Sequence, residues 1–254
     1  MSVSRSLVRL FPFAAFLVAL AVAASPASAV RPDSQAVLSP VAFEVQNPPS
    51  PVLGADGRRH MVYEILAVNQ SNLPVQIRKV APRAQGNRLG LPLIGSKLAE
   101  RMRINSGISG TTLPGGQSSM IFIDASYAAT RKRPKVVNHA ITIAYPNSAN
   151  PLEEVKSTFI GVSTKVSPVR PVVVSSPLRG PGWVAANGCC TLNAHRGATL
   201  AIDGTIRVPE RFAIDFVQLN SEDRLFTGPL TDLSSYAYFG APVRAAAAGD
   251  QSGT

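Results

Sequence analysis

Short runs of alternating apolar and polar residues fill the N-terminal half of this sequence. They occur at residues 41–45, 60–68, 119–123 and 139–145. Such alternation is typical of strands that bury one face, and few segments show a helical period. Proline and asparagine cluster between the runs, where they end strands by withholding ladder donors or by forming turns. The pattern predicts a mainly β protein, with an immunoglobulin-like antiparallel β-sandwich over residues 30–166.

Two segments interrupt this β pattern. Residues 88–103 hold regularly spaced leucines and predict either a short helix or a long inter-strand loop. Residues 167–182 contain four prolines and three consecutive valines, which favours an extended, stiff connector. We therefore expect a Pro-rich linker over 167–182 and a second β-rich domain over 183–254.

The N-terminus has the features of a cleavable signal peptide. Arg5 and Arg9 precede an apolar run from Leu10 to about Val22, and small residues follow at Ala27-Ser28-Ala29. The run is shorter than the roughly 20 residues needed to cross a bilayer. We expect residues 1–29 to be removed, the mature protein to be secreted or periplasmic, and no membrane span to remain after cleavage.

The charge of the mature chain is positive. The sequence has 25 basic and 15 acidic residues, and residues 1–29 contain two arginines and no acids, which leaves 23 basic residues and a net charge of +8. An anionic polymer of the cell envelope is therefore a plausible partner. The basic residues are not interleaved with stacking aromatics, so we expect no nucleic-acid binding.

The two cysteines are adjacent, at Cys189 and Cys190. In an oxidising compartment they could form a strained disulfide with each other, stay as free thiols, or form an intermolecular bridge. They do not match a zinc-finger spacing, because the chain has no second pair of cysteines or histidines at such a spacing.

Asp215 lies in the segment Arg211-Phe212-Ala213-Ile214-Asp215-Phe216, which is otherwise largely apolar and β-like. Burying a carboxylate in such a strand is costly unless a cation, a metal or several donors satisfy it. The segment is therefore a candidate metal or ion-pair site. An ion pair of Asp215 with Arg196 or Arg207 is the alternative to a metal.

The C-terminal region resembles the opening of LytM-like, or lysostaphin-type, peptidoglycan metalloendopeptidases. The resemblance covers roughly residues 183–250 and depends on the order of several short motifs. These are Trp183, Asn187-Gly188-Cys189-Cys190, His195-Arg196, Ala213-Ile214-Asp215 and Tyr238-Phe239-Gly240-Ala241-Pro242-Val243. It implies an incomplete β-rich peptidase domain and a catalytic zinc that acidifies a bound water for attack on a peptide bond.

In this family the zinc ligands come from an HxxxD motif and from the second histidine of a later HxH motif. Asp215 matches the aspartate, but Arg211 stands four residues before it, and a protonated guanidinium cannot bind zinc. His195 is the histidine that could supply the missing imidazole from a neighbouring strand or loop. Its alternative role is that of a turn histidine bonded to the backbone.

No histidine follows His195, so the sequence contains no HxH motif. Two ligands do not make a catalytic zinc site. The resemblance therefore implies a C-terminally truncated and inactive relative of a zinc metalloendopeptidase that cleaves peptidoglycan cross-links, with Asp215 and His195 as metal ligands. The alternative is a non-catalytic envelope-binding or assembly protein that uses its β-sandwich.

Overall fold

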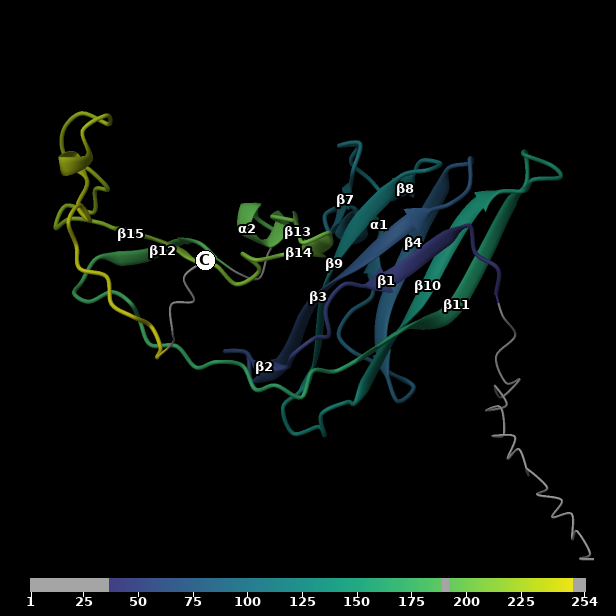
Figure 1. Cartoon of the computed structure of the whole chain (residues 1–254), viewed down its shortest axis with the longest axis horizontal. Coiled ribbons are helices and arrows are strands. Elements are labelled where there is room, and N and C mark those ends of the chain that lie inside the picture. Colours follow the sequence, from purple (N-terminus) through teal and green to yellow (C-terminus); the bar gives the residue numbers. More distant parts are fainter. Residues whose placement is uncertain (1–36, 189–191, 249–254) are drawn as a thin grey trace, which may run out of the picture. The chain divides into compact units, whose positions relative to one another are not determined.

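A computed structural model describes residues 37–188 and 192–248 of the chain (Figure 1). The expected signal peptide and both cysteines lie outside the described residues. The described residues from 38 onwards form one compact unit. The structure is mainly β, which confirms the predicted fold class, and no helix in the described part is long and apolar enough to cross a membrane.

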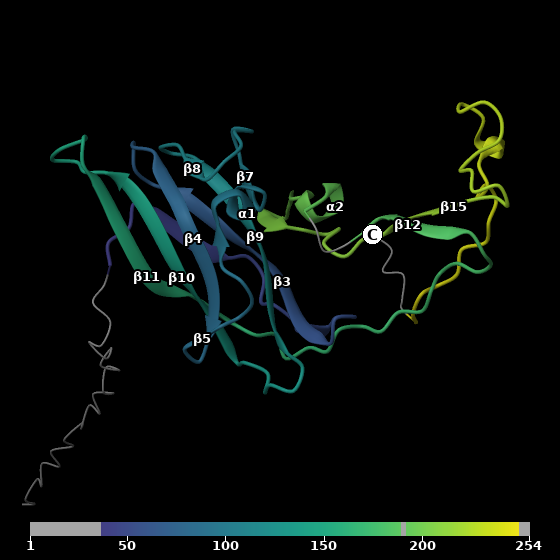
Figure 2. The same ribbon diagram turned by 180° about the vertical axis from the view of Figure 1, so that it is seen from behind.

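Two antiparallel sheets make up the region from 41 to 165, and both are visible from either side in Figures 1 and 2. In the first sheet the order is β1-β3-β9-β7, and β2 also pairs with β3. Its strands are β1 (Val41–Val45), β2 (Val52–Leu53), β3 (Arg58–Asn69), β7 (Met102–Ile104) and β9 (Ser118–Ala128).

The second sheet has the order β11-β10-β4-β5, with β6 and β8 also paired to β4. Its strands are β4 (Val75–Ala84), β5 (Asn87–Arg88), β6 (Leu93–Ile94), β8 (Thr112–Leu113), β10 (Val136–Pro146) and β11 (Glu154–Lys165). The segment 88–103 contains the short helix α1 (Gly95–Ala99), so the helical alternative for this segment is the correct one. Its buried Leu98 joins the hydrophobic core.

One hydrophobic core receives side chains from both sheets. Met61, Ile65 and Ile121 come from the first sheet, and Ile77 and Ile141 come from the second. In β3 the residues at odd positions from Met61 to Asn69 are buried, as alternation predicts. The β-sandwich arrangement and the immunoglobulin-like assignment stay predictions.

The C-terminal region contains shorter elements. Residues 166–182 form no helix or strand, and the Pro-rich linker and the domain limits stay predictions. The elements that follow are β12 (Trp183–Asn187), α2 (Ala194–Gly197), β13 (Leu200–Ile202), β14 (Thr205–Arg207), β15 (Asp215–Gln218) and the 3-10 helix η1 (Leu233–Ser235). β12 pairs with β15, and β13 pairs with β14, both in antiparallel fashion.

Candidate metal centre

His195 and Asp215 lie next to each other in the folded chain. His195 belongs to the short helix α2, and Asp215 is the first residue of β15. The Nε2 atom of His195 is 2.9 Å from Oδ2 of Asp215. The hypothesis that His195 supplies an imidazole beside Asp215 requires this proximity, and the structure provides it. That the pair binds a metal stays a prediction.

The helix α2 begins where the Asn193 side chain caps it. Asn193 Oδ1 accepts the backbone N–H of Arg196 at 2.8 Å, which satisfies one of the free donors at a helix start. The Asn193 amide group donates to Asn187 Oδ1 at 2.7 Å and to the Gly188 carbonyl at 2.5 Å. One asparagine therefore ties the helix that carries His195 to the end of β12.

Asp215 is positioned by strand pairing between β12 and β15. Its cross-strand partner is Asn187, whose amide donates to Oδ2 of Asp215 at 3.3 Å. The residues before Asp215 form turns and not the regular strand that the sequence suggested, because Arg211 N–H donates to the Val208 carbonyl and Ala213 N–H to the Glu210 carbonyl. The strand begins only at Asp215 itself.

Glu210 completes the surroundings of His195. Its Oε2 lies 2.7 Å from Nδ1 of His195, so the Nδ1–H group donates to a carboxylate. Glu210, which follows Pro209 in a polar turn, was not predicted from the sequence. The signal for it was weak, because a glutamate in a turn is most often solvated. The alternative role of His195, bonding to the backbone through its ring, is not what the structure shows.

The electrostatics of the site follow from these contacts. The carboxylate of Glu210, and then that of Asp215, raise the pKa of His195 above its ordinary value. The pKa of Asp215 is lowered by its contact with His195 and by the amide of Asn187. The side chains of Glu210 and Asp215 are 51% and 55% exposed, so solvent screens both interactions. The expectation of a buried Asp215 is therefore wrong.

The Nε2 atom of His195 is itself buried and has no aligned hydrogen bond among the described residues. Asp215 Oδ2 is close to it but lies off the direction in which an Nε2–H would point, so the contact is electrostatic. If the ring is neutral with its proton on Nδ1, the carboxylate oxygen lies beside the Nε2 lone pair and not along its axis. A metal ion bound by both atoms would therefore require the His195 ring or the Asp215 carboxylate to reorient, because a ligand lone pair is directed at its metal.

The pair fits two ligands of a tetrahedral zinc. With Zn–N and Zn–O distances near 2.0–2.2 Å, two such ligand atoms lie about 3.3–3.5 Å apart, so a small separation of the observed pair would admit the ion. A histidine that binds zinc through one nitrogen usually donates its other N–H to a carboxylate, as Nδ1 does here. Within the described residues, no group of three His, Cys, Asp or Glu side chains is arranged to hold a metal.

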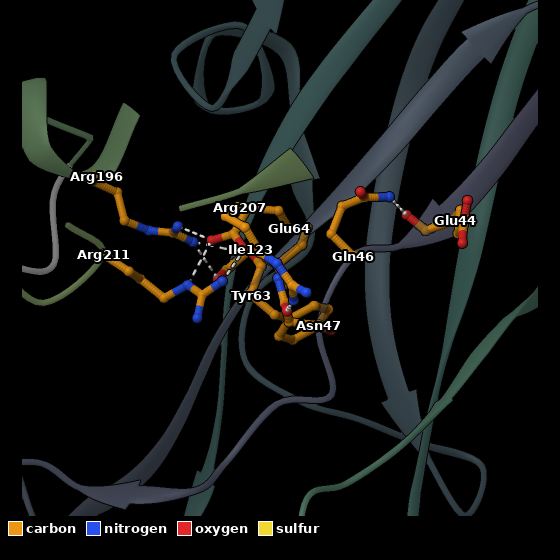
Figure 3. Close-up of polar contacts among 9 residues, drawn as sticks. All are labelled: Glu44, Gln46, Asn47, Tyr63, Glu64, Ile123, Arg196, Arg207 and Arg211. Atoms are coloured by element: carbon orange, nitrogen blue, oxygen red, sulfur yellow. Dashed lines mark hydrogen bonds and ion pairs between the residues drawn. The ribbon is translucent and has the colours of Figure 1, made fainter. Parts of the chain in front are cut away.

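Arg211, which stands where the family has its first histidine, does not interact with Asp215. Its guanidinium makes a forked pair with Glu64 of β3, with Nε 2.9 Å from Oε1 and Nη2 2.5 Å from Oε2 (Figure 3). Arg196 also pairs with Glu64, and Arg207 contacts Asn47. The proposed ion pair of Asp215 with Arg196 or Arg207 is therefore wrong.

Comparison with known proteins does not extend this picture. No family model and no curated protein matches the chain. A solved structure described as "X-ray structure of Northeast Structural Genomics Consortium target SoR45" matches 51% of this chain and 88% of its own, with 10% identity and a TM-score of 0.32. This likeness is too weak to bear on fold or function.

Proposed function

We propose that this chain is a cell-envelope protein whose C-terminal region carries part of the zinc site of a LytM-like peptidoglycan metalloendopeptidase. His195 and Asp215 would be the two protein ligands, and Glu210 would orient His195 through Nδ1. The observation that supports this most directly is the 2.9 Å approach of the buried His195 Nε2 to Asp215 Oδ2. The peptidase family, zinc and peptidoglycan enter only through the resemblance of the motifs.

Zinc bound in such a family site acidifies a water molecule that attacks the peptide carbonyl. The residues of this chain position the two ligand side chains. Glu210 holds the Nδ1 proton, which leaves Nε2 of His195 unprotonated beside Asp215. Asn187 steadies the Asp215 carboxylate by one hydrogen bond. Since a catalytic zinc needs three protein ligands, we expect these 254 residues not to hydrolyse peptidoglycan without a further ligand.

Zinc titration of the purified chain tests the site. We expect one Zn²⁺ per chain, measured by calorimetry, and loss of that binding in His195→Ala and in Asp215→Asn. His60→Ala is a matched control, because the His60 ring also lies between two carboxylates, those of Asp56 and Asp124. Absence of zinc binding, or its loss in His60→Ala with retention in the other two variants, would contradict the proposal.

A second candidate function is binding to an anionic envelope polymer through the region of the two sheets, residues 41–165. It is favoured by the loop between β9 and β10, where Arg131, Lys132, Arg133 and Lys135 lie within five residues. Lys132, Arg133 and Lys135 are exposed. Co-sedimentation with purified cell wall should fall in the Lys132→Glu/Lys135→Glu double variant and should not change in His195→Ala. If the wild type, the double variant and His195→Ala co-sediment with cell wall equally, this loop is not the binding surface.

A further inference from the structure

A buried carboxylate on β3 joins the two segments that carry His195 and Glu210. Glu64 is fully buried although it points away from the hydrophobic core, since its neighbours Tyr63 and Ile65 occupy the core-facing positions. An unpaired carboxylate in such a place would be strongly unfavourable. Both partners that neutralise it come from the C-terminal region (Figure 3).

Arg196 is the first partner and is 1% exposed. Its Nη1 pairs with Oε1 of Glu64, and its Nη2 donates to the Tyr63 carbonyl at 3.1 Å. The guanidinium also lies over the ring of Phe122, 4.9 Å from the ring centre. Phe122 is the cross-strand partner of Glu64. Adjacent side chains on β3 and β9 therefore hold one arginine by an ion pair and a cation–π contact.

Arg211 is the second partner, through the two hydrogen bonds described above. A forked arginine–carboxylate pair fixes orientation as well as distance, because both N–H groups are directed by one rigid plane. Glu64 therefore receives two differently oriented guanidinium groups from segments 15 residues apart in the sequence. The relative position of these two segments is set by one carboxylate.

The residues that precede these arginines belong to the candidate metal centre. His195 comes directly before Arg196, and Glu210 comes directly before Arg211. The His195 Nδ1 to Glu210 Oε2 contact of 2.7 Å closes a ring of interactions that starts and ends at Glu64. We propose that Glu64 is a positioning residue, which holds helix α2 and the turn at 208–213 so that Glu210 orients the His195 ring towards Asp215. This inference rests on the proposed function only in assigning the oriented ring to zinc.

Glu64→Gln tests the inference, because glutamine preserves size and an acceptor but removes the charge that both guanidinium groups share. The first measurement is the low-field proton resonance of His195 Nδ1–H, which hydrogen bonding to Glu210 protects from exchange. We expect this protection to be lost. The second measurement is zinc affinity, which we expect to fall by about tenfold, as for other residues that orient a metal ligand.

The matched control is Glu154→Gln, which removes an exposed pair with Arg78. We expect neither measurement to change in that variant. A folded Glu64→Gln protein with an unchanged Nδ1 resonance would overturn the inference, even if its thermal stability had fallen. If the wild-type chain binds no zinc, the proposed function fails, whereas the resonance still decides whether Glu64 orients His195.

Arg211→Lys provides a second variant in case Glu64→Gln does not fold. A lysine keeps the charge but cannot make the forked contact, so the turn at 208–213 should lose its fixed orientation. We expect faster exchange of the His195 Nδ1 proton and a fall in zinc affinity of about threefold, which is smaller than the tenfold fall expected for Glu64→Gln. Exchange as slow as in the wild type would overturn the inference.

Discussion

Two regions of this chain depend on different interactions: the β region (residues 41–165) and the C-terminal region (residues 183–248). In the β region, apolar side chains from both sheets are fully buried in one core. Among the described residues of 183–248, Val208 is the only apolar side chain that is buried, whereas Phe212, Phe216 and Leu233 are exposed. The largest buried side chain of this second region is a charged one, Arg196. One region is held by apolar burial, and the other is anchored by ion pairs to Glu64.

The histidines of the two regions show the same difference. His139, on β10, is fully buried and has neutral partners, with Nε2 2.7 Å from the Tyr63 hydroxyl and Nδ1 2.8 Å from the Val162 carbonyl. Burial lowers the pKa of His139 to about 4. His195 lies between two carboxylates, which raise its pKa. A histidine can therefore serve a packed core as a neutral residue, or a partly open site as a cation or ligand.

The largest effect should come from cavity formation in the β core. Ile141 is fully buried in the middle of β10, and Ile141→Ala should lower the free energy of unfolding by about 3 kcal/mol, from lost transfer energy and the cavity left behind. Ile202, on β13, is 44% exposed, so Ile202→Ala should cost less than about 0.5 kcal/mol. Urea unfolding followed by circular dichroism measures both. Equal costs would remove the contrast between the regions.

The next effect is a loss of stability in acid that originates at His139. Its folded pKa of about 4 lies below the unfolded value of 6.5, so the unfolded chain binds the proton first as the pH falls. The contribution of His139 is complete above pH 6.5 and is lost between pH 6.5 and 4, which amounts to about 3 kcal/mol at most.

Urea midpoints measured at several pH values check this prediction, with His139→Gln as the comparison. The glutamine variant should be less stable at pH 7 but should show a flatter dependence on pH in this window. Parallel curves for the two proteins would mean that another group titrates. His195 acts in the opposite direction, because a raised pKa contributes stability at low pH that is lost as the pH rises through the folded pKa.

The sequence predicted the strands well because their signal is local. Alternation alone identifies β3 and β10, and the turn residues between the runs mark where strands end. The proximity of His195 and Asp215 could also be anticipated, because the chain offers no other histidine near that segment. The class of fold and two residues of the candidate site were therefore accessible without a structure.

The role of Glu64 was not accessible in the same way. At an even position of an alternating strand, a glutamate is expected to face solvent. Its partners lie 132 and 147 residues further along the chain, and no local pattern records such a contact. A buried carboxylate in an apolar segment needs a cation, and the segment in which this holds is Tyr63-Glu64-Ile65-Leu66 and not the one that contains Asp215.

The most local predicted effect concerns the cap of helix α2. Asn193→Ala removes the acceptor for the Arg196 N–H, which should cost about 1 kcal/mol, equivalent to roughly fivefold faster exchange of that amide proton. Hydrogen exchange followed by NMR measures the exchange rate of the Arg196 amide proton separately from all others. In the β core, the exchange of amides in β10 should stay as slow as in the wild type, because the cap contributes nothing to that core.

Asn193→Asp separates the two functions of the Asn193 side chain. Aspartate still accepts from Arg196 N–H, so the cap should survive and the Arg196 amide should exchange as in the wild type. It cannot donate to Asn187 Oδ1 or to the Gly188 carbonyl, so the link between α2 and β12 should weaken. Faster exchange of the Arg196 amide in both variants would show that the link, and not the cap, holds the helix that carries His195.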